Sequence, residues 1–339
     1  MNALDSTSAL MLFGTPLWLW FVFGGVVIAL LALDLGVLHG RDRVIGVKES
    51  LWLSAGYVAV ALIFAAGVSW HLGADSALAF LTGYTIEKTL ALDNIFLISA
   101  VFASLAVPRE YQHKVLFWGI LGVIVSRALL IGLGAALVSQ FHWILYVFGA
   151  FLIFTGIRML VRPEGELNLV THSVLGWMRR HMRITTGFHG SRFWIKAPAE
   201  VGPVAAGAPS REVLWATPLL LALVLIELLD LVFAVDSVPA IFAITQDPFI
   251  VYTSNIFAIL GLRALYFCLA ALVERFHYLS YALAAVLVFV GGKILSADLL
   301  GPMPAWVSLL VTVSLLAAGV LYSLYRTRAK TPLPVQELS

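Results

Sequence analysis

The sequence predicts an all-α, polytopic membrane protein with about nine transmembrane helices and an inverted repeat of acidic helix pairs. Of its 339 residues, 61% are hydrophobic and only 12% are charged, and the mean hydropathy is +0.97. A soluble domain of this size would need far more polar surface. Apolar runs of about twenty residues, the length that crosses a hydrocarbon core of about 30 Å, recur along the whole chain.

Nine apolar runs are long enough to cross the bilayer as helices. They cover 17–38, 51–70, 77–104, 114–137, 142–161, 214–243, 250–273, 278–296 and 304–325. The first run is expected to remain as a helix rather than be cleaved as a signal peptide, because no Lys or Arg precedes it and Asp34 lies within it. The runs 77–104 and 214–243 also carry acidic residues, whereas the remaining runs are almost entirely apolar.

The basic residues predict the orientation of these helices. Arg41 and Arg43 follow the first run, Arg275 follows the seventh, and Arg326 and Arg328 follow the last, while the alternate connections hold almost none. Because Lys and Arg accumulate in cytoplasmic connections, we expect the N-terminus outside the cytoplasm and the C-terminus inside it.

The chain is expected to divide around one long polar loop. Its parts are a first transmembrane half of five helices at 1–162, a basic cytoplasmic loop at 163–213, a second transmembrane half of four helices at 214–326 and a cytoplasmic tail at 327–339. Within the loop, 192–196 alternates like a strand of a short hairpin, and 198–209 has the composition of a linker. The loop would either set the topology and touch anionic lipid head groups, or regulate the protein.

Two apolar runs contain the same pair of acids. Glu87 precedes Asp93 by six residues, and Asp230 precedes Asp236 by six residues. A carboxylate in hydrocarbon costs several kcal/mol, so such residues usually face a partner or a water-filled path. On a straight helix the two acids would point about 120° apart. Pro239 is expected to kink the second of these helices beside Asp236.

The agreement between the two segments extends beyond the acids. When Glu87 is placed on Asp230, Asn94 falls on Ser237, and farther along the chain Arg127-Ala-Leu matches Arg263-Ala-Leu. The second acidic helix comes three spans after the first, so one runs inward and the other outward. Inverted repeats of this kind are typical of secondary transporters, whose ions bind near the membrane midplane.

Acids outnumber bases within the predicted spans. Two further acids, Asp34 and Glu227, add to the four of the repeat, against the three basic residues Lys88, Arg127 and Arg263. Buried ion pairs would account for half of these acids and leave the others without a partner. A bound cation neutralises the excess, whereas an anionic substrate would be repelled. We therefore expect transport of a cation, with protons as a second ion.

The available donor atoms indicate the class of cation. Besides the carboxylates, the spans offer oxygen from Asn94, Asn255 and Ser237. Such hard ligands suit Mg²⁺, Ca²⁺ and Mn²⁺, whereas Zn²⁺ and Cu(I) prefer imidazole and sulfur. The single cysteine, Cys268, cannot form an intrachain disulfide or a thiolate cluster. Nucleic acid is not an expected partner.

At these residues the chain resembles the TerC/Alx family of integral membrane proteins. The matching segments are ALDLGVLHGR at 32–41, EKTLALDNIF at 87–96 and the long stretch at 216–267 that contains LLDLVFAVDSVPAIF. The resemblance implies an exporter of Mn²⁺ in the bacterial inner membrane. Carried over by position, the implied metal site consists of Asp34, Glu87, Asp93, Asp230 and Asp236, with Asn94 and Ser237 as neighbours. Glu227, Leu228 and Leu229 depart from the family, where a small residue is expected before the aspartate.

Several alternatives remain open at this stage. The resemblance also allows a membrane partner that supplies Mn²⁺ to exported enzymes alongside the secretion machinery. The same acids would serve proton antiport or uniport, and the sequence gives no oligomeric state. The chain has no nucleophile-and-base set, nucleotide loop or cofactor motif, so we expect neither an enzyme nor an organic cofactor.

Overall fold

The computed structural model describes residues 11–38, 47–141, 143–161, 175–178, 180–185, 187–198, 212–269, 279–301 and 303–328. Nearly all of them are helical. The helices are α1 (Leu17–Leu38), α2 (Val47–Leu72), α3 (Ala74–Ser104), α4 (Arg109–Gln140), α5 (Ile144–Val161), α7 (Pro218–Phe242), α8 (Pro248–Ile259), α9 (Leu262–Leu269), α10 (Leu279–Leu300) and α11 (Ala305–Arg328). Six helices in this part of the chain are long and apolar enough to cross a membrane. The expected all-α, polytopic membrane architecture is confirmed.

The predicted runs agree with the helices except at two places. Residues Glu212–Ala216 form a strand, β4, so the helix expected from 214 begins only at Pro218. Proline suits the first turn of a helix because its missing N–H has no helical partner there. The run 250–273 divides into α8 and α9, because Gly261 has a φ of +82° that a right-handed helix does not contain.

Helix α7 does not end at Pro239, where the sequence predicts a kink beside Asp236. Helix α7 continues across Pro239, and the Pro239 carbonyl accepts a hydrogen bond of 3.0 Å from the Ala243 amide. The missing proline N–H therefore costs α7 one hydrogen bond without ending it. The chain is interrupted one helix later instead, at Leu260 and Gly261.

Each acidic helix, α3 or α7, packs against the helix that follows the other acidic helix in the chain. Helix α3 lies along α8, and helix α4 lies along α7. Along α4 and α7 the contacting residues advance together, from Gly119 beside Ile226 to Gly134 beside Phe242, so these helices run parallel. This exchange of neighbours is the arrangement that a two-fold relation between the repeats produces.

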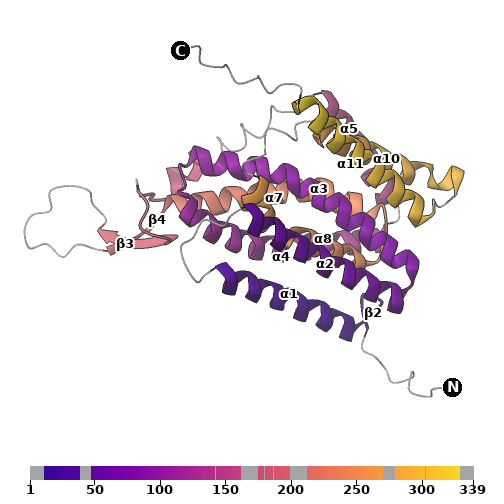
Figure 1. The fold of residues 1–339 in the computed structure, drawn as a ribbon, viewed down its shortest axis with the longest axis horizontal. Coiled ribbons are helices and arrows are strands. Elements are labelled where there is room, and N and C mark those ends of the chain that lie inside the picture. The colour runs from indigo at the N-terminus through magenta and orange to yellow at the C-terminus, as the bar shows by residue number, and fades with distance from the viewer. Residues whose placement is uncertain are drawn as a thin grey trace, which may run out of the picture.

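Aromatic side chains hold α1 and α2 to this central group. Phe23 of α1 and Phe64 of α2 contact the rings of Phe249 and Phe257 in α8. Phe64 also contacts Phe80 of α3. Such ring contacts add to the burial of apolar surface. Helix α1 lies at the edge of the bundle (Figure 1).

A two-stranded hairpin lies at one end of the helices (Figure 1). Strand β3 (Trp194–Pro198) pairs antiparallel with β4 (Glu212–Ala216), with Lys196 opposite Leu214. The strand expected at 192–196 is therefore present, shifted by two residues, whereas most of the predicted linker lies outside the described residues. The segment before β3 contacts α4, since Lys114 Nζ donates a hydrogen bond to the Ser191 carbonyl.

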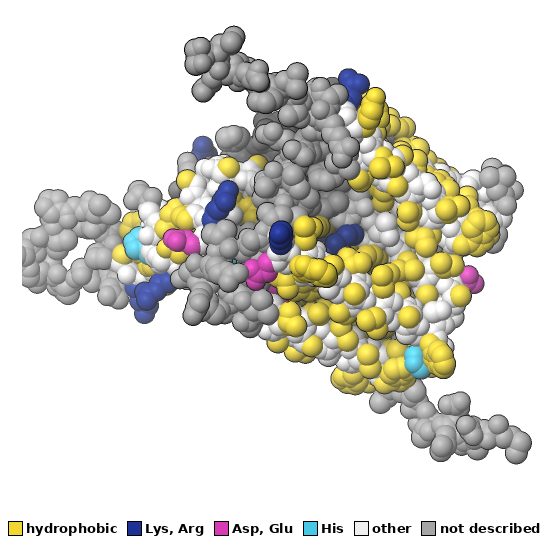
Figure 2. All heavy atoms as spheres, viewed as in Figure 1, with side chains coloured by type: hydrophobic (Ala, Val, Ile, Leu, Met, Phe, Trp, Pro, Cys, Tyr) yellow, Lys and Arg dark blue, Asp and Glu magenta, His cyan; other side chains and the backbone are white. Residues whose placement is uncertain are grey.

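The surface of the helices is apolar, as a lipid-facing surface should be. On the face drawn in Figure 2, hydrophobic side chains cover the helical body, and most of the visible Lys and Arg side chains lie in the half that carries the hairpin. The opposite end, near β2 (Thr15–Pro16), shows none. The basic side chains visible on this face are therefore concentrated toward the hairpin end of the helices.

Candidate cation site

Arg127 is the centre of a buried polar group formed by three helices. It lies on α4, and its side chain is 1% exposed. Its Nη1 atom is 3.0 Å from Glu87 Oε1 on α3, and its Nη2 atom is 3.3 Å from Asp230 Oδ1 on α7. Nη1 also donates a hydrogen bond to the Ser237 hydroxyl. One guanidinium therefore joins both repeats of the sequence.

The spacing of residues on α7 explains this arrangement. Asp230 and Ser237 are seven residues apart, close to two full helical turns, so both face α4. The backbone position of Asp236, six residues after Asp230, is turned by about 120° from it on an ideal helix.

Two carboxyl oxygens in this region have no hydrogen-bond partner. Oε2 of Glu87 and Oε1 of Glu227 are both buried and unpaired. Glu227 packs on a glycine face of α4, where a Cβ on Gly119 would lie 3.7 Å from its Oε1 and a Cβ on Gly122 would collide with its carboxyl group. Buried polar groups without partners are rare in folded proteins, so these oxygens mark places where a ligand or water would be stabilised.

The charges of this group do not balance. Three carboxyl groups, that of Glu87 on α3 and those of Glu227 and Asp230 on α7, lie beside α4. Arg127 supplies one positive charge. Bound cations, protons among them, would neutralise the remaining charge in a medium of low dielectric constant.

Lys88, expected as a counter-charge to the acids, caps a helix instead. Its Nζ atom donates hydrogen bonds to the carbonyl oxygens of Ala258, at 3.0 Å, and Leu260, at 3.4 Å. These carbonyls lie at the end of α8, where the interruption at Gly261 removes their helical partners. A cation is also favoured at the negative end of a helix dipole.

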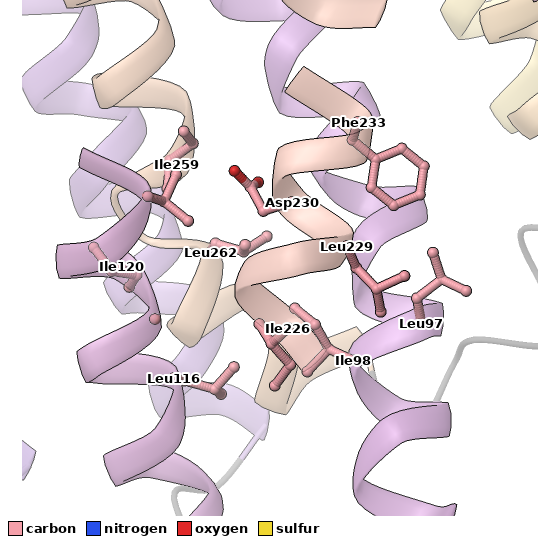
Figure 3. Close-up of a pocket in the computed structure, with 12 residues that line it drawn as sticks. Leu97, Ile98, Leu116, Ile120, Ile226, Leu229, Asp230, Phe233, Ile259 and Leu262 are labelled. Atoms are coloured by element: carbon pink, nitrogen blue, oxygen red, sulfur yellow. The ribbon is translucent and has the colours of Figure 1, made fainter. Parts of the chain in front are cut away.

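A cavity of about 40 Å³ adjoins Asp230. Its walls come from α3, α4, α7 and the α8–α9 junction, and Asp230 is the charged residue among them. Figure 3 shows the Asp230 carboxyl group extending from α7 toward the side of Ile259, at the end of α8. The space suits roughly two or three waters, or a cation without its full hydration shell.

The other described candidates lie outside the contacts of Arg127. Asn255 of α8 is fully buried, and neither its amide nitrogen nor its amide oxygen has a hydrogen-bond partner. Asp34 is buried near the end of α1. Both are therefore buried, on helices other than those that surround Arg127.

Four candidates lie on described helices, but their side chains are outside the described part. Asp93 and Asn94 belong to α3, Asp236 to α7 and Arg263 to α9. Among the side chains that the structure does describe, no group of three or more His, Cys, Asp or Glu residues is close enough to hold a metal ion. A site built on Glu87 and Asp230 would thus draw its further ligands from hydroxyl, amide and backbone oxygens, or from the remaining acids of the repeat.

Sequence reasoning did not identify the backbone of the α8–α9 junction as part of this region. Two signals were available. Gly261 interrupts an apolar run, where glycine often marks a special backbone conformation, and Gly119 and Gly122 share the face of α4 that Glu227 contacts.

Comparisons with known proteins place the chain in a family. Residues 72–331 match the model of the integral membrane protein TerC family. An uncharacterized membrane protein of Myxococcus xanthus, STKORF319, is 48% identical over 315 residues, which cover 93% of this chain and 94% of that protein. An uncharacterized membrane protein of Rickettsia bellii is 42% identical over 307 residues, covering 91% and 97%.

A named relative adds detail to this match. The putative membrane-bound redox modulator Alx of Escherichia coli K12 is 46% identical over 295 residues, covering 84% of this chain and 87% of that protein. No solved structure matches. The family model covers most of the residues that carry the buried polar group, and the relatives span nearly the whole chain. The chain belongs to the TerC family of integral membrane proteins.

Proposed function

We propose that this protein exports Mn²⁺ from the cytoplasm across the bacterial inner membrane, through a central carboxylate site and by exchange for protons. The observation that carries the proposal is the charge of the buried group, in which Glu87 and Asp230 contact one guanidinium, Glu227 lies on the same helix as Asp230, and two carboxyl oxygens lack a partner. A transported cation supplies the missing positive charge and is released again when the site opens.

The ligand chemistry supports a hard divalent ion. Glu87, Asp230, Ser237 and Asn255 offer only oxygen donors, which suit Mn²⁺, Mg²⁺ and Ca²⁺ better than ions that prefer sulfur or imidazole. The choice of Mn²⁺ among these ions follows the family resemblance. The cavity beside Asp230 is too small for a hydrated ion, so the ion would lose water as it binds.

The orientation of the chain belongs to the same proposal. The N-terminus would lie outside the cytoplasm, and the β3–β4 hairpin and the C-terminus inside it. The basic residues of the hairpin segment, such as Arg192 and Lys196, support a cytoplasmic position.

Mn²⁺ efflux from preloaded cells, or Mn²⁺ uptake into inside-out vesicles, tests this function. The intact chain should move Mn²⁺ faster than membranes without the protein, and faster than it moves Ca²⁺ or Mg²⁺. Glu87→Gln, Asp93→Asn and Asp236→Asn should abolish this efflux at matched expression, whereas Glu110→Gln, at the exposed start of α4, should leave it intact.

The same measurement across a pH gradient tests proton exchange. An outside pH below the inside pH should accelerate Mn²⁺ efflux, because protons then move inward as Mn²⁺ leaves. Efflux equal to that of empty membranes would refute export and would favour a membrane partner that delivers Mn²⁺ to exported enzymes.

A further inference from the structure

The guanidinium of Arg127 uses the same oxygen atoms that a transported cation would need. It contacts Glu87 Oε1, both carboxyl oxygens of Asp230 and the hydroxyl of Ser237. A divalent ion on these oxygens would lie within a few ångströms of the guanidinium, where like charges repel strongly in a medium of low dielectric constant. Arg127 and the ion are therefore alternative occupants of one ligand set.

The contacts to Asp230 are long for a charged pair. The two nitrogen–oxygen distances are 3.4 Å and 3.3 Å, whereas charge-assisted hydrogen bonds of this type are usually about 2.7–2.9 Å. The contact to Glu87, at 3.0 Å, is shorter. Asp230 is thus the less tightly held carboxylate, and it is also the one that faces the cavity (Figure 3).

A carrier that exports an ion must also return without it. Protons taken up in exchange neutralise some of its acids on the return, but any acid that stays ionised and unpaired would leave buried negative charge, which is costly at membrane depth. A guanidinium already attached to α4 neutralises part of this charge in the absence of the ion. The buried pair then serves a conformational step rather than stability alone.

We propose that Arg127 is a tethered counter-ion that takes the place of the transported cation when the carrier is empty and gives up its oxygen ligands when the cation binds. This inference rests on the proposed function and adds a role for a specific residue within it. It predicts that loss of the guanidinium separates binding from net transport.

Purified protein in liposomes allows the separation to be measured with Mn²⁺. In Arg127→Gln, Mn²⁺ should bind about tenfold more tightly or better, because a competing charge is gone. Exchange of radiolabelled Mn²⁺ for unlabelled Mn²⁺ across the membrane should persist, since the loaded carrier moves in both directions. Net efflux into Mn²⁺-free solution should fall at least about tenfold, because the empty carrier no longer returns.

Matched variants keep this result interpretable. Arg109→Gln makes the same change on the same helix at an exposed position and should behave as the intact protein. Arg127→Lys keeps one positive charge without the planar fork that reaches two carboxylates, so it should bind Mn²⁺ more tightly than the intact protein and retain part of the net efflux. This variant tests the idea even if Arg127→Gln does not fold.

Three results would overturn the inference. The first is that Arg127→Gln folds but neither binds nor exchanges Mn²⁺, which would make Arg127 a structural residue. The second is net efflux of Arg127→Gln equal to that of the intact protein. The third is that Arg127→Lys has the same Mn²⁺ affinity as the intact protein. If the intact protein neither binds nor moves Mn²⁺, the proposed function fails together with this inference.

Discussion

The α4–α7 and α3–α8 interfaces are built from corresponding parts of the repeat, yet they use their basic residues differently. At α4–α7, Arg127 lies on the side chains of Asp230 and Ser237. At α3–α8, Lys88 lies on backbone carbonyls at the end of α8. When Glu87 is placed on Asp230, Tyr84 falls on Glu227, so the first interface is acidic where the second carries a neutral hydroxyl.

This difference separates a replaceable interaction from a fixed one. Carboxylates that bind a guanidinium can bind another cation instead, because both ligands are held by the same charge. The backbone carbonyls at an interrupted helix end are fixed by the helix itself, so they hold the lysine in one place. We therefore expect the α4–α7 side to carry the ion chemistry and the α3–α8 side to position it.

The largest expected effect tests this division of roles directly. Asp230→Asn should lower Mn²⁺ efflux about 100-fold, because it removes the charge that holds a cation at membrane depth. On the other side, Tyr84→Phe should lower efflux less than about threefold, since the tyrosine hydroxyl carries no charge. Efflux assays at matched expression compare them. Equal losses would show that both interfaces bind the ion.

Replacing Lys88 should weaken the α3–α8 side. Lys88→Met removes two hydrogen bonds from a charged donor and leaves the Ala258 and Leu260 carbonyls without it, at a cost of about 1.5–3 kcal/mol in the free energy of unfolding. Hydrogen–deuterium exchange should rise at the α8–α9 junction. As a control, Lys114→Met removes an ammonium that binds the Ser191 carbonyl near the hairpin, and it should leave exchange at the α8–α9 junction unchanged. If hydrogen–deuterium exchange at this junction is unaltered in Lys88→Met, Lys88 does not cap α8.

Replacing glycine with alanine should be tolerated at the α4–α7 interface and should destabilise the protein at the α8–α9 junction. Gly261 has a positive φ, and a Cβ there would lie 2.7 Å from Cγ of Tyr57, so Gly261→Ala should cost about 1–3 kcal/mol. A Cβ on Gly122 meets the far end of the Glu227 side chain, which can move, so Gly122→Ala should cost less than about 1 kcal/mol. Thermal unfolding in detergent measures both, and the reverse order would contradict this assignment.

The smallest effect concerns the start of α8. The Asp247 carboxyl accepts a hydrogen bond of 2.9 Å from the Phe249 amide, so Asp247→Ala should cost about 1 kcal/mol and Asp247→Asn much less. Burial raises the pKa of this carboxyl above its usual 3.8, although the backbone donors at Phe249 and Ile250 act in the opposite direction.

The raised pKa of Asp247 also sets the sign of a pH effect. The folded protein then holds this proton more tightly than the unfolded chain, so its contribution to stability is present below pH 3.8 and is lost as the pH rises through the raised pKa. Asp247→Asn should remove this dependence. Melting temperatures that fall equally with pH in both proteins would assign it to other groups.

Much of the fold was predictable because membrane helices must be apolar and long. The first run coincided with α1, and the next four lie within a few residues of α2 to α5. The errors arose where backbone conformation outweighs hydropathy. Gly261 interrupts an apolar run that is otherwise typical of one helix, and β4 is apolar enough to resemble the start of α7.

The site was predictable in its members more than in its contacts. The repeat identified Glu87, Asp230, Arg127 and Ser237, and the structure brings these four together. The direction of Lys88 could not be predicted, because it depends on carbonyls freed by a helix interruption that hydropathy does not reveal. Nor could the sequence show that Glu227 rests on the glycines of α4.

The exchange of partners between the repeats also limits how the protein can be assembled. Because α3 lies against α8 and α4 against α7, each half of the chain lacks its main neighbours until the other half is present. Neither half should accumulate in the membrane by itself. Two chains divided between β3 and β4 should restore each other when they are produced together, and a ribosome that stalls before α7 would leave an insertion intermediate that requires protection from proteases.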